Sequence, residues 1–175
     1  MERGEVIELE ARRRIYEHIV ANPGTHLRAV KEALEMPMGQ LEYHLRFLEE
    51  QGLVGAKEDR YYKRFFPSEM GATDRRLLSG LRQEMPRRIV LLVLASPGVD
   101  HRTIQENTGL GASTLSFYMR DLIEKGLIER RREGRRSLYV VLDVERVLKV
   151  LITYRPSFLD RMVDAFLETW FELEP

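Results

Sequence analysis

HLRFLEEQGLV (residues 44–54) is matched 74 positions later by YMRDLIEKGLI (residues 118–128). Leu48 falls on Leu122, and Gly52 falls on Gly126. The same offset holds without a gap from residues 14–67 to residues 88–141. A period of this length is that of a small domain rather than that of a solenoid unit. The sequence therefore predicts a duplicated domain.

Each repeat is expected to form three helices followed by two strands. In the first repeat, the apolar stripe of the opening helix stops at Asn22-Pro23-Gly24, which breaks a helix. The third helix carries Leu41, Leu45 and Leu48 on one face. Gly52 then ends this helix in the C′ position. Two strands around a charged loop complete the repeat.

The second repeat follows the same plan. Its first helix is predicted from about Arg87, after the Met85-Pro86 break, to Ala95. Asp100 is the expected N-cap of the second helix, as Thr25 is in the first repeat. Glu133-Gly134 lies between the two strands as a hairpin turn.

These elements predict a mainly α protein with small β-hairpin wings. The expected domains are residues 1–70 and 87–143, joined by a helical connector over residues 71–86. Residues 144–175 are expected to add C-terminal helices. At 175 residues and 43% apolar content, the chain is long enough for two compact domains.

Two helices joined by a short turn and followed by a β-hairpin make a winged helix-turn-helix. Residues 44–54 and 119–128 resemble the end of the recognition helix in ArsR- and MarR-like regulators. Most of the chain resembles archaeal transcriptional regulators that carry two winged helices in tandem. The resemblance implies DNA binding, but winged helices also serve as protein–protein modules, so it indicates the fold more strongly than the activity.

The net charge of zero hides an uneven distribution. Residues 14–67 hold eight basic and eight acidic residues, whereas residues 86–142 hold ten basic and six acidic ones. Residues 143–175 hold four basic and seven acidic residues, which offsets most of that surplus in the total. The second repeat is therefore basic, as expected for a domain that binds a polyanion.

The buried leucines of each third helix fix which side chains face outward, toward a major groove that admits one helix. Hydroxyls, glutamine and arginine can hydrogen-bond base edges there, and an aromatic ring can contact a thymine methyl. Cationic hairpins suit backbone contacts or a narrow minor groove. The predicted DNA-binding residues are Ser113, Thr114, Ser116, Phe117, Arg120, Arg130, Arg131, Arg132, Arg135 and Arg136 in the second repeat, and Gln40, Tyr43, Arg46, Lys57, Arg60 and Lys63 in the first.

The first repeat is the weaker candidate for DNA binding. Its third helix carries Glu42, Glu49 and Glu50, which dilute the positive field, although Arg64 extends the basic wing. This repeat either assists the second repeat or reads a second half-site, or it contacts the other repeat or another protein instead. The expected function is a sequence-specific double-stranded DNA-binding transcriptional regulator. The alternative is a protein–protein scaffold in a transcription or chromosome-organisation complex.

The C-terminal tail predicts two amphipathic helices. Ser157 with Asp160 three residues later has the pattern of a capping box for the last helix. The apolar stripe of that helix is broad for packing on one small domain. The resemblance to MarR-like regulators implies a homodimer here, with packing inside one chain as the alternative. The predicted dimerisation residues are Phe158, Met162, Phe166 and Trp170.

Catalytic and metal chemistry are not expected. The sequence has no phosphate-binding loop, nucleophile elbow or zinc-protease motif, and its four histidines are scattered. The absence of cysteine excludes thiolate metal sites and fits an intracellular protein. Neither end has the apolar run of a membrane span or signal peptide. We therefore expect a non-enzyme without cofactor or membrane partner, located in the cytoplasm with the nucleoid; no effector ligand follows from the sequence.

Overall fold

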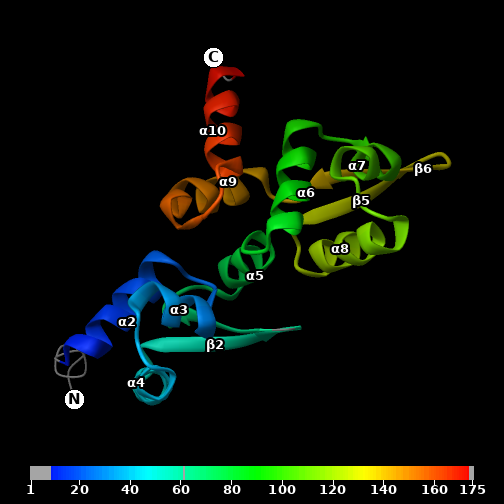
Figure 1. The fold of residues 1–175 in the computed structure, drawn as a ribbon. Coiled ribbons are helices and arrows are strands. Elements are labelled where there is room, and N and C mark those ends of the chain that lie inside the picture. Colours follow the sequence, from blue (N-terminus) through cyan, green and yellow to red (C-terminus); the bar gives the residue numbers. More distant parts are fainter. Residues whose placement is uncertain (1–8, 61, 174–175) are drawn as a thin grey trace. The chain divides into compact units, whose positions relative to one another are not determined.

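The computed structural model describes residues 9–60 and 62–173, and the chain divides into two compact units, residues 1–75 and 76–175 (Figure 1). Each unit combines helices with one small three-stranded antiparallel sheet. The predicted fold class, mainly helical with β-hairpin wings, is confirmed. No helix in the described residues has the length and apolar character needed to cross a membrane.

The first unit contains a helix-turn-helix and a wing. The sheet has β3 in the middle, between β1 and β2. α3 and α4 form the helix-turn-helix, and β2 and β3 form the wing. The elements are α2 (Glu10–Ala21), β1 (Thr25–His26), α3 (Leu27–Leu34), α4 (Met38–Glu50), β2 (Val54–Asp59), β3 (Tyr62–Pro67) and α5 (Ala72–Leu81), within which the first unit ends.

The second unit repeats this order and adds the tail. Here β6 is the middle strand, between β4 and β5. α7 and α8 form the helix-turn-helix, and β5 and β6 form the wing. The elements are α6 (Glu84–Ala95), β4 (Val99–Asp100), α7 (His101–Thr108), α8 (Ala112–Glu124), β5 (Ile128–Glu133), β6 (Arg136–Val141), α9 (Val144–Thr153), the 3-10 helix η1 (Arg155–Ser157) and α10 (Met162–Leu173).

The backbone hydrogen bonds of the two units also repeat at the offset of 74. The Gly24 N–H donates to the Phe65 carbonyl at 2.8 Å, and the Gly98 N–H donates to the Tyr139 carbonyl at 2.9 Å. Because the backbone frames match, a side chain in one unit can be compared directly with the one 74 positions away. The Leu53 N–H donates to the Leu48 carbonyl, and the Leu127 N–H donates to the Leu122 carbonyl. Likewise, the Ser68 N–H donates to the Leu53 carbonyl, and the Leu142 N–H donates to the Leu127 carbonyl.

Gly52 and Gly126 end the two recognition helices, as the spacing predicts. Their φ angles are +66° and +73°, in the left-handed region that an L side chain rarely adopts. Each recognition helix, α4 or α8, therefore ends at a fixed residue, and the first strand of its wing, β2 or β5, follows directly.

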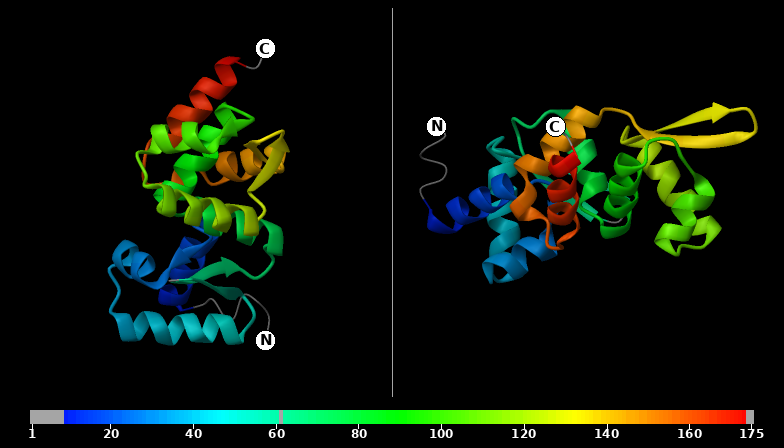
Figure 2. Two further views of the ribbon diagram at one scale, coloured as in Figure 1. Left: turned by 90° about the vertical axis from the view of Figure 1, so that its right-hand side faces the viewer. Right: turned by 90° about the horizontal axis from the view of Figure 1, so that it is seen from above.

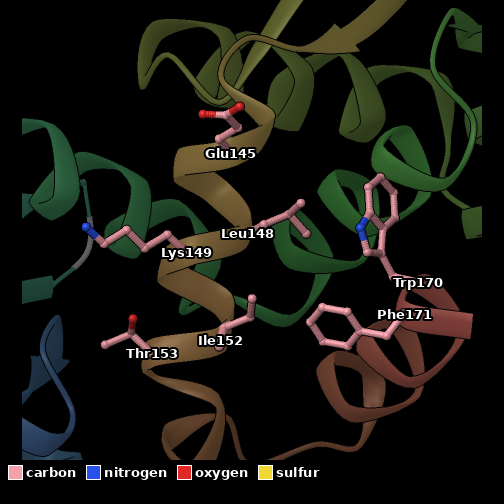
Figure 3. A pocket seen from close by; sticks show the side chains of 7 residues that line it. All are labelled: Glu145, Leu148, Lys149, Ile152, Thr153, Trp170 and Phe171. Carbon is pink, nitrogen blue, oxygen red and sulfur yellow. The ribbon is translucent and has the colours of Figure 1, made fainter. Parts of the chain in front are cut away.

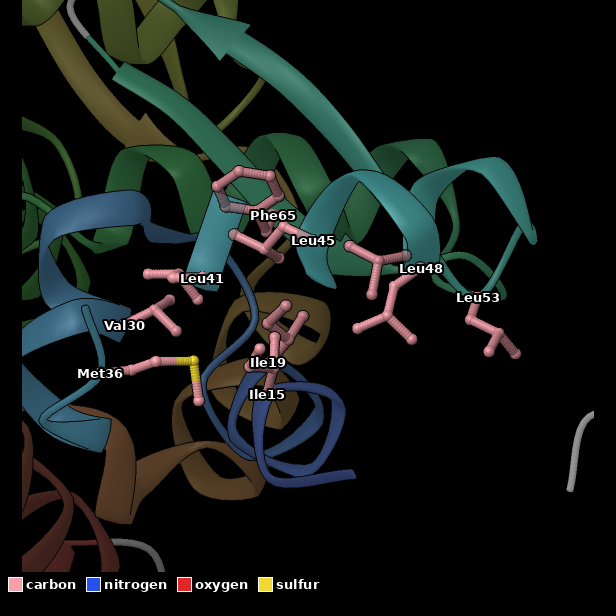
Figure 4. Close-up of a cluster of buried hydrophobic side chains, with 10 residues drawn as sticks. Ile15, Ile19, Val30, Met36, Leu41, Leu45, Leu48, Leu53 and Phe65 are labelled. Atoms are coloured by element: carbon pink, nitrogen blue, oxygen red, sulfur yellow. The ribbon is translucent and has the colours of Figure 1, made fainter. Parts of the chain in front are cut away.

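The core of the first unit lies between α2, α3, α4 and the sheet (Figure 4). Ile15 and Ile19 of α2 are fully buried together with Leu41 and Leu48 of α4, and Leu45 is nearly so. Burial of such a side chain stabilises the fold by about 1.5–3 kcal/mol. This burial fixes the rotation of α4 about its axis, and so decides which of its residues face solvent.

Two helix starts differ from the sequence expectation. α6 begins at Glu84 instead of near Arg87. Pro86 lies in its first turn, where the missing N–H leaves no helical hydrogen bond unmade, so the proline does not divide the helix. α3 is capped by His26, whose Nδ1 accepts from the Ala29 N–H at 3.2 Å, while Thr25 pairs with β3.

The N-cap of α7 is confirmed, but the capping box of the tail is wrong. Asp100 Oδ1 accepts from the Thr103 N–H at 2.8 Å. Ser157 lies in η1 instead, and its hydroxyl accepts from Arg82 Nη1 at 2.8 Å. Asp160 Oδ1 accepts from the Met162 N–H at 3.0 Å, so α10 begins at Met162.

The first unit is expected to lose stability as the pH falls below about 6.5, the ordinary histidine pKa. Burial lowers the pKa of His26, as does the Arg64 guanidinium, and burial and Arg12 lower the pKa of His44. Folded pKa values below the unfolded ones mean that stability is fully present above pH 6.5 and is lost toward the folded values. Urea denaturation at pH 7.5 and 5.5, followed by circular dichroism, measures this change.

The control for this prediction is His26→Asn. Asparagine keeps an N-cap acceptor but does not titrate. This variant should therefore lose the share of the pH dependence that His26 contributes. An unchanged pH profile in His26→Asn would contradict the assignment to His26.

Candidate nucleic-acid interface

α8 presents a polar face that its own packing holds outward. Leu115, Met119 and Leu122 are buried on one side of the helix, which turns the opposite side toward solvent. Phe117 is half-buried, and its ring meets the Tyr118 ring edge-on at 5.6 Å between centroids. The predicted residues that are exposed on α8 are Ser113, Thr114, Ser116 and Arg120.

The β5–β6 hairpin projects beyond the helices of its unit (Figure 2, right). Gly134 occupies the first position of its two-residue turn with φ of +60°, which glycine adopts readily. The five arginines predicted for DNA binding are all on this hairpin, and all are exposed: Arg130, Arg131, Arg132, Arg135 and Arg136.

Few carboxylates neutralise these arginines. Arg131 Nη2 pairs with Glu129 at 3.1 Å, whereas Arg130 Nε donates to the neutral Ser137 hydroxyl at 3.0 Å. In the described part of the chain, Arg132 and Arg135 make no ion pair. Hydrogen bonds from Thr103 lower the pKa of Asp100, and the nearby Arg136 guanidinium lowers it further. The hairpin is therefore a cationic finger with most of its charge available.

α8 also keeps one of its carboxylates off the outward face. Asp121 is buried, and its Oδ2 pairs with Lys125 Nζ at 2.8 Å. The outward face between Ser113 and Arg120 therefore carries no acidic side chain. Such a surface can approach a phosphate backbone without like-charge repulsion.

The first unit presents a different surface. Gln40 and Arg46 of α4 are exposed, and Tyr43 is 63% exposed. Lys57 and Arg60 of the hairpin are also exposed. These five predicted residues therefore lie where they were expected, on the outward side of α4 and on the wing.

The other two cations of the first hairpin are engaged within the unit. Lys63 Nζ lies 3.0 Å from the Glu49 carboxylate of α4. Arg64 is only 3% exposed, pairs with Asp59 at 2.9 Å and donates to the Gly24 carbonyl at 2.8 Å. Arg64 therefore holds the hairpin together and is not a surface cation, contrary to its expected place in the basic wing.

The predicted dimerisation residues do not share one environment. Phe158 is 8% exposed and lies under the Arg82 and Arg87 guanidinium groups, at 4.9 and 5.4 Å from its ring centroid. Arg87 also pairs with Asp160. Phe158 therefore anchors the tail to its own unit, whereas Met162, Phe166 and Trp170 of α10 are half-buried.

A cleft of about 390 Å³ separates α9 from α10 (Figure 3). Leu148 and Ile152 of α9 face Trp170 and Phe171 of α10 across it. Ile152 is 46% exposed and Phe171 is 56% exposed. The tail thus leaves an apolar surface open in the single chain.

The family model described as "HTH_HVO_0163_N, N-terminal HTH domain" matches residues 9–78. Residues 9–78 of this chain are therefore similar to the N-terminal helix-turn-helix domain of that family. The chain is also 32% identical over 132 residues to the uncharacterized HTH-type transcriptional regulator MJ1398 of Methanocaldococcus jannaschii, an archaeon. That alignment covers 75% of this chain and 33% of MJ1398. The chain therefore spans about a third of the length of the curated relative it matches.

Two solved structures are similar to about half of the chain. HlyU from Vibrio cholerae N16961 has 21% sequence identity and a TM-score of 0.43, covering 49% of this chain and 91% of that chain. The homodimeric winged helix-turn-helix DNA-binding domain Mb0332 from Mycobacterium bovis, a possible ArsR-family regulator, has 26% identity and a TM-score of 0.42. It covers 51% of this chain and 83% of that chain.

The HTH domain of residues 9–78 has an open cleft of about 370 Å³ beside its recognition helix. Leu27, Leu45 and Phe65 give it apolar walls. Glu42, Arg46, Glu49 and Lys63 supply charges of both signs. This mixture distinguishes the recognition surface of the HTH domain from that of the second unit.

Metal binding has no support in the described residues. No group of three or more histidine, aspartate or glutamate side chains lies close enough together there to hold an ion. His44, on the recognition helix of the HTH domain, is buried and has Tyr43 at its edge, 5.2 Å between centroids. His44 is therefore a packing residue.

Proposed function

We propose that this chain is a sequence-specific, double-stranded DNA-binding transcriptional regulator. α8 enters the major groove, and the β5–β6 hairpin contacts the backbone beside it. The single observation that carries this proposal is the exposed cluster of hairpin arginines next to a recognition helix whose outward face between Ser113 and Arg120 lacks carboxylates. The match to an HTH-type transcriptional regulator over 75% of the chain supports it.

The β5–β6 hairpin and α8 have different roles in this proposal. The hairpin supplies charge, and each phosphate that it neutralises releases counterions, which makes binding dependent on salt. α8 supplies hydroxyls from Ser113, Thr114 and Ser116 for base edges, and Arg120 suits the O6 and N7 acceptors of guanine. Backbone contacts thus position the helix, and base contacts specify the sequence.

Selection from a random duplex pool tests this function. The enriched duplex and a scrambled duplex are then titrated by fluorescence anisotropy at several salt concentrations. A specific regulator should bind the enriched duplex at least about a thousandfold more tightly than the scrambled one. Equal affinity for both duplexes would leave a non-specific binder, and no binding at low salt would refute DNA binding.

Arg120→Ala is expected to weaken binding to the selected site by about 1–3 kcal/mol and to relax the preference at one base position. The reason is the loss of one base contact from an exposed helix position. Repeating the selection with this variant measures the change. Arg161→Ala, an exposed arginine of the tail, is the control. A uniform loss over all sequences would assign Arg120 to the backbone instead.

We also propose that the chain forms a homodimer through α9 and α10. The exposed Ile152 and Phe171 side chains beside the α9–α10 cleft support this proposal. Phe171→Glu should shift the sedimenting species from twice the chain mass to the single chain, because a carboxylate would be buried without a partner. A sedimentation profile that this substitution leaves unchanged would contradict the interface.

A further inference from the structure

The two units place different charges at matching positions. α4 and the β2–β3 hairpin (residues 38–50 and 54–67) carry five basic and five acidic residues. α8 and the β5–β6 hairpin (residues 112–124 and 128–141) carry six basic and four acidic residues. The difference in number is small, so the placement of the charges decides what each surface can bind.

The ion pair between helix and hairpin is the first difference in placement. In the first unit, Lys63 of the hairpin binds Glu49 of the recognition helix at 3.0 Å. The matching positions of the second unit hold Ser137 and Ile123, which carry no charge. Ser137 binds Arg130 instead and leaves its guanidinium charge uncompensated.

The outward face of the helix is the second difference. Glu42 is exposed on α4, at the cleft beside the hairpin, where the second unit has the neutral Ser116. A carboxylate there would meet the phosphate backbone whenever α4 docked in a groove as α8 is proposed to dock. Like charges at such an interface disfavour the complex.

The inner side of the hairpin is the third difference. Arg64 and Asp59 form a buried pair in the first unit, where the second unit has Leu138 and Glu133. Burial removes Arg64 from any surface that DNA could touch. Lys63 and Arg64 thus both pair with carboxylates of their own unit, Lys63 at the surface and Arg64 in the interior.

We infer that Glu42 and Glu49 are negative determinants that keep the recognition surface of the first unit off DNA, so that the second unit alone contacts the backbone. This inference rests on the proposed DNA-binding function. Glu42 repels phosphate directly. Glu49 acts by holding Lys63, which would otherwise be available for a phosphate.

Charge removal in each unit is the first test. The salt dependence of binding to one duplex is measured for the full chain, for Arg46→Gln/Lys57→Gln and for Arg130→Gln/Arg131→Gln. The slope of log K against log salt changes by about 0.9 for each phosphate contact. We expect no change for the first pair and a fall of about two for the second pair.

Neutralising the two carboxylates of the first unit is the second test. Glu42→Ser/Glu49→Gln gives the first unit the neutral character of the second and frees Lys63. We expect the slope to steepen by about one to two and the affinity at about 0.1 M salt to rise roughly tenfold or more. Glu10→Gln/Glu17→Gln changes the net charge by the same amount at exposed positions of α2, outside the recognition helix and the hairpin. That control should leave the slope unchanged.

Each outcome separates the two proposals. If the full chain binds no duplex at low salt, the DNA-binding function fails and this inference fails with it. If the full chain binds but Arg46→Gln/Lys57→Gln lowers the slope by about two, only the inference is overturned. An equal gain from Glu42→Ser/Glu49→Gln and from the α2 control would also overturn it, because the effect would then be net charge and not position.

Discussion

Replacing Arg130, Arg131, Arg135 and Arg136 by glutamine should weaken DNA binding about a thousandfold at about 0.1 M salt. All four side chains are exposed on the β5–β6 hairpin. If each contacts one phosphate, the slope of log K against log salt should fall by about three to four. Fluorescence anisotropy with one duplex at several salt concentrations measures both quantities.

The fold should survive this change. Of the four side chains, only Arg130 and Arg131 bond to another side chain within the described residues, and both bonds are at the surface. Exposed ion pairs contribute about 0–1 kcal/mol to stability. The control places glutamine at Arg13, Arg14, Lys31 and Arg161, which are also exposed, and removes the same net charge elsewhere. A slope that stays unchanged in the hairpin variant, or falls equally in this control, would refute the hairpin as the backbone contact.

The sequence predicted the helices of the winged fold well because their signals are local. Leu41, Leu45 and Leu48 share one helical face, and Gly52 ends the helix, so both the burial and the boundary follow from spacing. Because the second repeat matches the first at an offset of 74 residues, the same spacing predicts the buried face and the end of α8. Burial of the leucines then determined the outward face, and the predicted helix residues proved to be exposed except for the half-buried Phe117.

Tertiary contacts account for most of what the sequence did not predict. The β1 and β4 strands are two residues each and exist because β3 and β6 pair with them. Ser157 and Asp160 have the spacing of a capping box. In the structure, however, Arg82 donates to the Ser157 hydroxyl, and Arg87 pairs with the Asp160 carboxylate. Neither competing partner is near in sequence, so no local pattern could reveal it.

The burial of Arg64 was not predicted, although the sequence does contain a signal for it. In composition it is one more cation in a basic wing. Its counterpart 74 residues later is Leu138, an apolar residue, and Arg64 begins the run of β3 that is buried, residues 64–67. Comparison of the repeats at the level of single strand positions would have indicated an inward side chain. The partner Asp59, however, follows only from the register of β2 and β3.

Arg64→Leu is expected to destabilise the first unit by about 3–5 kcal/mol, although leucine occupies the matching position of the second unit. Arg64 Nε pairs with Asp59 at 2.9 Å and its Nη1 donates to the Gly24 carbonyl at 2.8 Å, both in the interior. Removing the cation leaves the Asp59 carboxylate buried without it, which costs far more than the pair contributes. In the second unit the same leucine is harmless because Glu133 is exposed.

The double variant Arg64→Leu/Asp59→Asn separates lost charge compensation from lost packing. Because asparagine needs no counter-charge, we expect it to restore more than half of the stability lost by Arg64→Leu. Trp170, the single tryptophan of the chain, lies in α10 and reports on the second unit, whereas circular dichroism reports on both. In urea, the single variant should therefore shift part of the circular dichroism transition and leave the Trp170 fluorescence transition in place. If Asp59→Asn restored nothing, the buried charge would not be the cause, and the carbonyl of Gly24 would become the group whose lost hydrogen bond explains the instability.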